Sequence, residues 1–477
     1  MNHLFSQFRI RFSHKFLFYF LIFALFIIGA GFRNISADWI KDSNENMPVC
    51  TAKNEQHFPS LTSDGSGGLI VGWRDARNAN RDVFAQRVSL TGEMLWGDNG
   101  IPVCDLPSAQ SWPSVIPDES GGAILVFGDS RARNQDIYAQ RISANGELLW
   151  DKEGVAVCIH PTLQDDVKAI SDGMGGAIIV WEDWRNGNQD IYAQKIDSDG
   201  KPVWAVNGIP VHRADGDQYD PVVVADGTGG VIVVWWDIST NDWDIFAQRV
   251  NAAGETVWGD GAVPVCTASG NQGGPFVTAD GAGGVFVVWS DYRNDPNILT
   301  SADLYAQRID ANGVALWEKD GISICNNPAN QQQPEGISDG VGGLIVTWWD
   351  ERDVFADIYA QRLGSDGKPM WQVNGIPVCT AEGQQRQPQI VPDESQGAII
   401  YWLDYREDYG NVTMDAIYAQ RIDANGKSLW ALNGMPVCTA DGDQISPKAI
   451  SDGRGGAFIV WSDTRNENHD IYIHQVR

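Results

Sequence analysis

The chain has 477 residues, a formal net charge of −28 at pH 7, and unusually many Gly (51) and Trp (20) residues. An acidic surface repels phosphate backbones and the sequence carries no basic stripe, which excludes nucleic acid as the expected partner. The length also exceeds what one ordinary hydrophobic core serves. A repeat array avoids that limit, because each repeat packs only against its neighbours.

The first element in the chain is an apolar run over residues 16–32, with basic residues ahead of it and a small residue, Ala37, at a plausible cleavage point. This layout predicts a secretory signal peptide over residues 1–37. The alternative is an uncleaved membrane anchor. Cleavage would remove four basic and no acidic residues, giving a net charge of −32. The mature protein would then be secreted, periplasmic or on the bacterial cell surface, with no remaining membrane span.

From residue 38 onward, one unit of about 54 residues occurs eight times. Its opening Asp recurs as Asp64, Asp118, Asp172, Asp226, Asp280, Asp339, Asp393 and Asp452. A fixed period near 50 with strand-like content is typical of a propeller. We therefore predict an all-β fold over residues 38–477: an eight-bladed β-propeller of four-stranded antiparallel blades.

Each unit contains four strand patterns. The third copy and the start of the fourth show them clearly: a short stretch such as 221–224, an apolar run such as 176–181, the phrase Asp-Ile-Tyr-Ala-Gln-Lys, and a segment ending in Ile-Pro-Val-His. Asp-Gly-x-Gly-Gly joins the first two strands, because glycine supplies the positive φ angles of a tight hairpin. Pro in the fourth strand places that strand at a sheet edge.

The two ends of the chain complement each other. Residues 39–50 match the tail of the unit, whereas the eighth copy stops at Arg477 without that tail. We expect the N-terminal strand to pair with the last blade, which closes the ring and hides two strand edges. The strand before Asp-Gly then lines the central channel. The loops between strands 2 and 3 and the crossovers between blades (4–1) share one face, where we expect function to reside.

Two repeated polar features have structural explanations. Seven Cys residues occupy one slot of the unit and His212 fills the eighth. Equivalent points on neighbouring blades lie beyond the ~7 Å limit for a disulfide, so we expect small buried side chains. The Asp of Trp-x-Asp is followed two positions on by Arg in seven copies, which predicts an internal ion pair or turn cap. Calcium binding stays an alternative only in the fourth loop, which lacks the Arg, at Asp237, Asp242 and Asp244.

The Ser-Asp-Gly…Ile-Val-Trp…Arg…Asp-Ile-Tyr order resembles the TolB-type and WD-like propeller repeats of bacterial envelope proteins, over about residues 39–477. The longer phrase with Trp-x-Asp-x-Arg, Asp-Ile-Tyr-Ala-Gln-Arg and Gly-x-x-Leu-Trp resembles uncharacterised secreted bacterial repeat proteins. The hairpin departs from the sialidase Asp-box, Ser-x-Asp-x-Gly-x-x-Trp. The resemblance implies a propeller fold and no particular reaction.

Two sets of residues are candidates for ligand binding. Aromatic residues beside Asp, Asn and Gln on the loop face suit stacking against sugar rings, or else pack under neighbouring loops: Trp112, Trp184, Tyr219, Trp243, Tyr292, Trp349 and Tyr405. A Gln stands eight residues before each hairpin Asp and either meets a ligand at the channel mouth or pairs with crossover backbone: Gln56, Gln110, Gln164, Gln218, Gln272, Gln331, Gln385 and Gln444.

These features predict an exported, monomeric propeller that binds carbohydrate or a surface or envelope protein. No catalytic residue, resident metal or cofactor is assigned, because the seven His residues are scattered. One alternative is a polysaccharide-acting enzyme, a glycoside hydrolase or lyase, with carboxylates from loops around the channel; its first suspects are Asp350, Asp404, Glu407 and Asp408. A purely structural envelope component is the other alternative.

Overall fold

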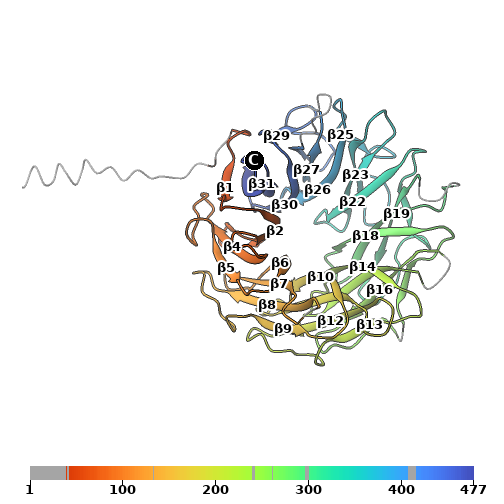
Figure 1. Cartoon of the computed structure of the whole chain (residues 1–477). Helices are drawn as coiled ribbons and strands as arrows, with labels where there is room; N and C mark the ends of the chain where they lie inside the picture. Colours follow the sequence, from red (N-terminus) through yellow and green to blue (C-terminus); the bar gives the residue numbers. More distant parts are fainter. Residues whose placement is uncertain are drawn as a thin grey trace, which may run out of the picture. The chain divides into compact units, whose positions relative to one another are not determined.

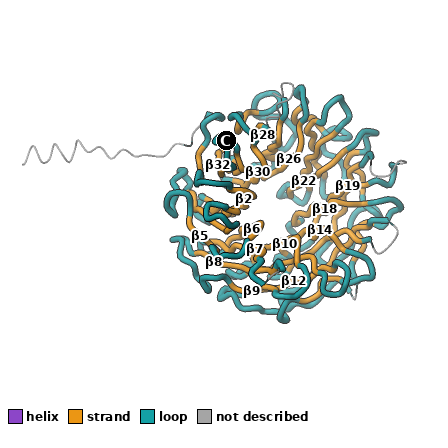
Figure 2. The backbone as a smooth tube through the Cα atoms, in the orientation of Figure 1, coloured by secondary structure: helices purple, strands orange, loops and turns teal. Residues whose placement is uncertain are grey.

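The computed structural model describes residues 39, 42–132, 134–238, 242–259, 261–295, 300–406 and 415–477. Trp39–Arg477 form one compact unit. It consists of eight four-stranded sheets arranged in a ring around a central channel (Figure 1), with strands joined by loops and turns (Figure 2). The predicted signal peptide lies outside the described residues and stays a prediction. Within the described part of the chain, no helix has the length and apolarity needed to cross a membrane.

Seven blades are continuous in sequence. The strands are, blade by blade, β2 (Gln56–Ser63), β3 (Leu69–Asp75), β4 (Asp82–Val88) and β5 (Ile101–Cys104); β6 (Gln110–Pro117), β7 (Ala123–Asp129), β8 (Asp136–Ile142) and β9 (Val155–Cys158); β10 (Gln164–Ser171), β11 (Ala177–Asp183), β12 (Asp190–Ile196) and β13 (Ile209–His212); β14 (Gln218–Ala225), β15 (Val231–Asp237), β16 (Asp244–Val250) and β17 (Val263–Cys266); β18 (Gln272–Ala279), β19 (Val285–Asp291), β20 (Asp303–Ile309) and β21 (Ile322–Cys325); β22 (Gln331–Ser338), β23 (Leu344–Asp350), β24 (Asp357–Leu363) and β25 (Ile376–Cys379); β26 (Gln385–Pro392), β27 (Ala398–Asp404), β28 (Ala416–Ile422) and β29 (Met435–Cys438).

The eighth blade closes the ring. It contains β30 (Gln444–Ser451), β31 (Ala457–Asp463), β32 (Asp470–Val476) and, as its outer strand, β1 (Met47–Cys50). Met47 pairs with Ile473, and the buried Asn46 donates from Nδ2 to the carbonyl of Val437 at 2.8 Å. β1 pairs with β32, and Figure 1 shows β1 next to the C-terminal end of the chain. The predicted blade number and closure are confirmed.

Within each of the seven continuous blades, the strands run outward from the channel in chain order. In blade 3 the order is β10-β11-β12-β13, with β10 nearest the channel (Figure 1). Every residue of β11 is buried, as expected for an apolar strand covered on both faces. The first strand is longer than predicted: β14 begins at Gln218, which already pairs with Asp237 ahead of an irregularity in the strand.

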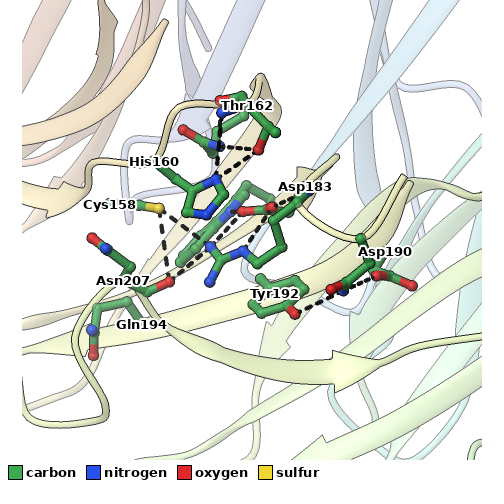
Figure 3. Close-up of polar contacts among 12 residues, drawn as sticks. Cys158, His160, Thr162, Asp183, Asp190, Tyr192, Gln194 and Asn207 are labelled. Carbon is green, nitrogen blue, oxygen red and sulfur yellow. Dashed lines mark hydrogen bonds and ion pairs between the residues drawn. The ribbon is translucent and has the colours of Figure 1, made fainter. Parts of the chain in front are cut away.

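An aspartate–arginine network fixes the 2–3 loop in seven blades, shown for blade 3 in Figure 3. Asp183 accepts hydrogen bonds from Trp181 Nε1 (2.8 Å) and from the backbone N–H of Arg185 (2.9 Å). Arg185 Nη2 lies 2.6 Å from Asp183 Oδ2 and donates to the carbonyl of Asn207 (2.9 Å) and to Cys158 Sγ (3.4 Å). The predicted ion pair is confirmed in the seven blades that carry the Arg.

The cysteines belong to this same network. All seven are buried with free thiols, and burial raises the pKa of Cys158 to about 12, which disfavours the reactive thiolate. The expected burial is confirmed. The network of blade 4 departs from the pattern: His212, at the end of β13 in blade 3, replaces Cys, and its Nε2 lies 3.9 Å from Asp237 Oδ2. This is also the copy in which Ser239 replaces the Arg.

Candidate ligand-binding site

A β-bulge in each innermost strand shapes the channel mouth. In β14, for example, the register shifts between Tyr219 and Val222, and the residue inside the bulge, Asp220, has a φ of 48°. The equivalent residue has a positive φ in every blade and defines what we call the mouth residues: Phe58, Trp112, Asp166, Asp220, Gly274, Gln333, Gln387 and Ser446. Left-handed backbone is uncommon for residues other than glycine, and such strain concentrates at functional sites.

A hollow of about 800 Å³ opens between the mouth residues of six blades. It is lined on one side by Phe58 and Trp112, whose rings meet edge to face with centroids 6.3 Å apart. Trp112 is 54% exposed, so its ring is available to a ligand. The lining also includes carboxylates and amides, among them Asp166, Asp220 and Gln387. The hollow therefore combines apolar and polar walls, as small-molecule sites do.

Three carboxylates from blades 3 and 4 meet in this hollow. The side-chain oxygens of Asp166, Glu182 and Asp220 lie within 4.8 Å of one another. Glu182 is buried and accepts hydrogen bonds from Gln189 Nε2 (2.7 Å) and from the backbone N–H of Asp220 (2.9 Å). Burial raises the pKa of Glu182 to about 7. Burial also raises the pKa of Asp166, against the opposing effect of its ion pair with Lys168.

Oxygen ligands of this kind suit a hard divalent cation. Each of the three carboxylates already has a protein partner, however: Gln189 for Glu182, Lys168 for Asp166, and Trp236 Nε1 for Asp220 at 2.8 Å. We therefore assign no metal to the cluster. What the arrangement offers chemically is a carboxyl group, Glu182, that is close to half-protonated at neutral pH and stands beside two further carboxylates.

An aromatic ladder continues from the carboxylates toward blade 5. Tyr219 and Trp236 stack with ring centroids 4.4 Å apart and an interplanar angle of 23°. The ring centroid of Trp236 in turn lies 4.9 Å from that of Trp243. Tyr219 is anchored by its hydroxyl, which donates to Asp217 at 3.1 Å. The ladder borders a second hollow of about 550 Å³, whose lining also includes Phe276 and Tyr292.

The structure places four of the seven predicted aromatic residues at these hollows: Trp112 and Tyr219 line the first, and Trp243 and Tyr292 line the second. The other three, Trp184, Trp349 and Tyr405, line neither. Trp349 is buried, with its Nε1 donating to Gln333 and the Arg386 guanidinium over its ring. Trp184 and Tyr405 are half-buried in the loops of blades 3 and 7.

The eight predicted glutamines lie elsewhere. Each is at most 1% exposed, and each amide nitrogen donates to the carbonyl of the residue two positions before it, at 2.6–3.1 Å. The backbone N–H of Gln56 also bonds His469 O in the preceding blade, at 2.7 Å. These contacts fit the structural interpretation of the glutamines, and we do not carry them into the proposed site.

The sequence also suggested carboxylates for a polysaccharide-acting enzyme and for a calcium site, and the structure shows where the described ones lie. Asp350 and Asp404 are buried in the arginine networks of their own loops, and Glu407 and Asp408 lie outside the described residues. In the fourth loop, Asp242 accepts from the backbone N–H of Gly270 at 3.0 Å. In the part of the chain that the structure describes, the acidic groups gathered within metal-binding reach are those of the mouth, not those of this loop.

Sequence reasoning missed Phe58, Asp166, Glu182, Asp220 and Trp236. A signal for them exists at two positions that vary inside otherwise repeated strands. One is the second residue after each strict Gln, which is the mouth residue itself. The other is the middle residue of Trp-x-Asp, which is Glu in blade 3 and Trp in blade 4. Variation at these positions marks the channel mouth, whereas the sequence-based prediction placed ligand binding at aromatic residues of the loop face and at the strict glutamines.

No protein-family model matches the chain, and no curated protein matches its sequence. Among solved structures, the chain is similar to the polysaccharide lyase Uly1 (8% identity over 91% of this chain and 99% of that one, TM-score 0.47). It is also similar to a protein of unknown function from Dyadobacter fermentans (10% identity over 90% of this chain and 96% of that one, TM-score 0.40). A third similar structure is the Penicillium chrysogenum α-L-arabinanase complexed with arabinobiose (11% identity over 91% of this chain and 98% of that one, TM-score 0.36). At such identities the function must be argued from this chain's own residues, and the resemblance to TolB-type repeats stays a prediction.

Proposed function

We propose that the protein binds carbohydrate at the channel mouth, on the face that carries the 2–3 loops and the 4–1 crossovers. The observation that carries the proposal is the ladder of Tyr219, Trp236 and Trp243 beside the hollows, next to carboxylates and amides. Aromatic rings offer a large, rigid apolar surface with a polar edge. Carboxylates and amides supply acceptors and donors that can pair with the hydroxyl groups of a sugar.

The test is binding of the purified chain to a panel of neutral, amino and uronic-acid oligosaccharides, followed by calorimetry on those that bind. Replacing Trp236→Ala should weaken binding about tenfold or more, because truncating a central aromatic anchor costs over ~1.4 kcal/mol. The matched control is Trp184→Ala, which removes a half-buried Trp of the same face outside both hollows. Equal loss in the two variants, or no loss in Trp236→Ala, contradicts the proposal.

A panel on which the wild-type chain binds nothing would favour the two other roles, contact with a surface or envelope protein or a purely structural role. Pull-down of a stable partner would separate those two.

We also propose, from the signal-peptide pattern of residues 1–37, that the protein acts outside the cytoplasm: secreted, in the periplasm or at the cell surface. Detecting the mature N-terminus after residue 37 in a cell-free supernatant or periplasmic extract would test it.

A second candidate function is hydrolysis of a glycosidic bond, favoured by the convergence of Asp166, Glu182 and Asp220. Glu182, with a pKa of about 7, would donate a proton to the leaving oxygen. Asp166 or Asp220 would attack the anomeric carbon, and water would then release the sugar and restore both carboxyl groups. Oxygens within 4.8 Å are closer to the ~5–5.5 Å of retaining enzymes than to the ~6.5–9.5 Å of inverting ones.

This second candidate predicts that Glu182→Gln lowers turnover by about 10²–10⁴-fold with little change in binding, since general acid catalysis contributes that much. Turnover should fall as pH rises through about 7, because the acid form of Glu182 is lost there. Glu351→Gln, a partly exposed carboxylate paired with Arg386, is the control and should keep wild-type rates. Absence of released reducing ends with every oligosaccharide that binds would exclude hydrolysis.

A further inference from the structure

Blade 5 breaks the ring of mouth side chains. In the other seven copies, the two residues after the strict Gln both carry side chains, for example Tyr219-Asp220 and Gln332-Gln333. In blade 5 both are glycine, Gly273 and Gly274. The backbone does not demand this: Gly274 has a φ of 59°, and Gln333 adopts 52° at the same place in the next blade. What the two glycines change is therefore the space in front of β18.

The space they leave is partly filled and partly open. A Cβ added to Gly273 would lie 3.5 Å from the ring of Trp243. The Trp243 ring therefore packs against Gly273, and a larger side chain at position 273 would displace the ring. A Cβ added to Gly274 would meet nothing within 4 Å. The second hollow, of about 550 Å³, is lined by Gly273, Gly274, Trp236, Trp243 and Phe276 among others. It is an aromatic-walled space that the repeat pattern would otherwise fill.

The two hollows are continuous with each other. Both are lined by Lys168, Asp220, Gln387 and Gln389. Each hollow has the volume of a small-molecule site, roughly 300–1,000 Å³, so together they exceed the space that one sugar ring needs. The charged residues that line them are five acids and two bases: Asp165, Asp166, Glu182, Asp220 and Glu335, with Lys168 and Lys448. Burial raises the pKa values of Glu182 and Glu335 to about 7, so each carries part of a negative charge at neutral pH. The acids still outnumber the two lysines in negative charge, and like-charge contact disfavours an anionic ligand here.

Resting on the proposed function, we infer that the Gly273–Gly274 gap creates a second subsite, so that the protein binds a linear, uncharged oligosaccharide chain across the channel mouth. One unit would occupy the carboxylate-lined hollow, and further units would extend past Asp220 to the wall formed by Trp236 and Trp243. Selection against chains of uronic acids follows from the excess of carboxylates. The glycines are specificity-determining residues in this arrangement, because they decide how many units the site can hold.

The test replaces Gly274→Gln, which restores the side chain that blades 6 and 7 carry at this position with φ values of 52°. The control is Gly281→Gln in the hairpin of the same blade, on the opposite face. An added Cβ there also meets nothing within 4 Å, and the equivalent residues Glu119 and Glu394 adopt a φ of 59°. Affinities are measured by calorimetry for the dimers and hexamers of the cello- and xylo-oligosaccharide series and for the galacturonic acid hexamer.

We expect a neutral hexamer to bind wild-type protein at least about tenfold more tightly than its dimer. Gly274→Gln should remove that gain while leaving dimer affinity within about twofold, and Gly281→Gln should change neither. Equal wild-type affinity for dimer and hexamer, or an unaltered hexamer affinity in Gly274→Gln, overturns the second subsite while carbohydrate binding stands. Preferential binding of the galacturonic acid hexamer overturns the uncharged-chain assignment. Absence of binding by every sugar, dimers included, overturns the proposed function and this inference with it.

Discussion

His474 is one of three residues at which the third strand of the last blade departs from the Asp-Ile-Tyr-Ala-Gln-Arg pattern, and it replaces the Gln. In blade 1, the equivalent Gln86 accepts two backbone hydrogen bonds and donates one to Gly97, which ties the third strand to the segment that follows it. His474 is 5% exposed, and Asn46 Nδ2 lies 3.5 Å from its Nδ1. Burial lowers the pKa of His474 from 6.5 to about 4. A neutral imidazole is therefore part of the folded state.

This shift gives a signed prediction for stability against pH. The unfolded chain takes up a proton at His474 near pH 6.5, whereas the folded chain does so only near pH 4. Stability should thus fall as pH drops below about 6.5 and should level off below about 4, with a total loss of about 3 kcal/mol. His474→Gln should remove this loss. The measurement is urea unfolding of both proteins at pH 7.5 and pH 4.5. A difference between the two proteins that is the same at both pH values contradicts the prediction.

At the scale of elements, the repeat determined most of the fold in advance. Apolar runs such as β11, Asp-Gly hairpins and a chain that lacks its last outer strand were enough to predict four-stranded blades, their order from the channel outward, and closure by β1. These predictions succeed because each blade packs only on its two neighbours, so one unit of sequence carries the whole packing rule. The strictest residues, such as Gln218, are strict because every blade needs them for the same buried contacts.

The inner strands show what the sequence did not reveal. Their bulges redirect one residue per blade toward the channel, and hydrophobic pattern does not predict a bulge, since the alternation simply slips by a residue. A Pro after the mouth residue, as at Pro221, is a signal in hindsight, because proline inside a strand is confined to edges and bulges. The meeting of Asp166, Glu182 and Asp220 was beyond prediction as well, since it depends on two neighbouring blades being placed in space.

At the scale of the whole molecule, the ring depends on contacts between the two ends of the chain. Besides pairing through β1, residues near Asn46 receive the side chain of Arg465, which donates to the carbonyls of Asn44 and Glu45 and to Asn46 Oδ1 at 2.9–3.0 Å. Asn46 is 1% exposed and also donates to Val437. One buried amide therefore joins the first strand to two segments of the last two blades.

Replacing Asn46→Gly should lower the free energy of unfolding by roughly 1–3 kcal/mol, the range for leaving buried hydrogen-bonding partners unpaired. Glycine suits the local φ of 40°, so backbone strain is not the cause. Hydrogen exchange should quicken first in β1 and β32. Asn54→Gly, an exposed position with a φ of 62° and one hydrogen bond to Ala76, is the control. Equal exchange in β1 for the two variants would show that the amide does not hold the ring shut.

The closing blade also sets the order of assembly. Hairpins within one blade join residues close in sequence, whereas the contact of Arg465 with Glu45 spans 420 positions, and contacts of such separation form slowly because a long loop must close first. During synthesis, β1 emerges before the other strands and waits for its partner β32, which is made after them. The slowest stage of folding should accordingly be the docking of this single strand, at a rate independent of protein concentration, and until then the molecule is an open arc with two unsatisfied edges.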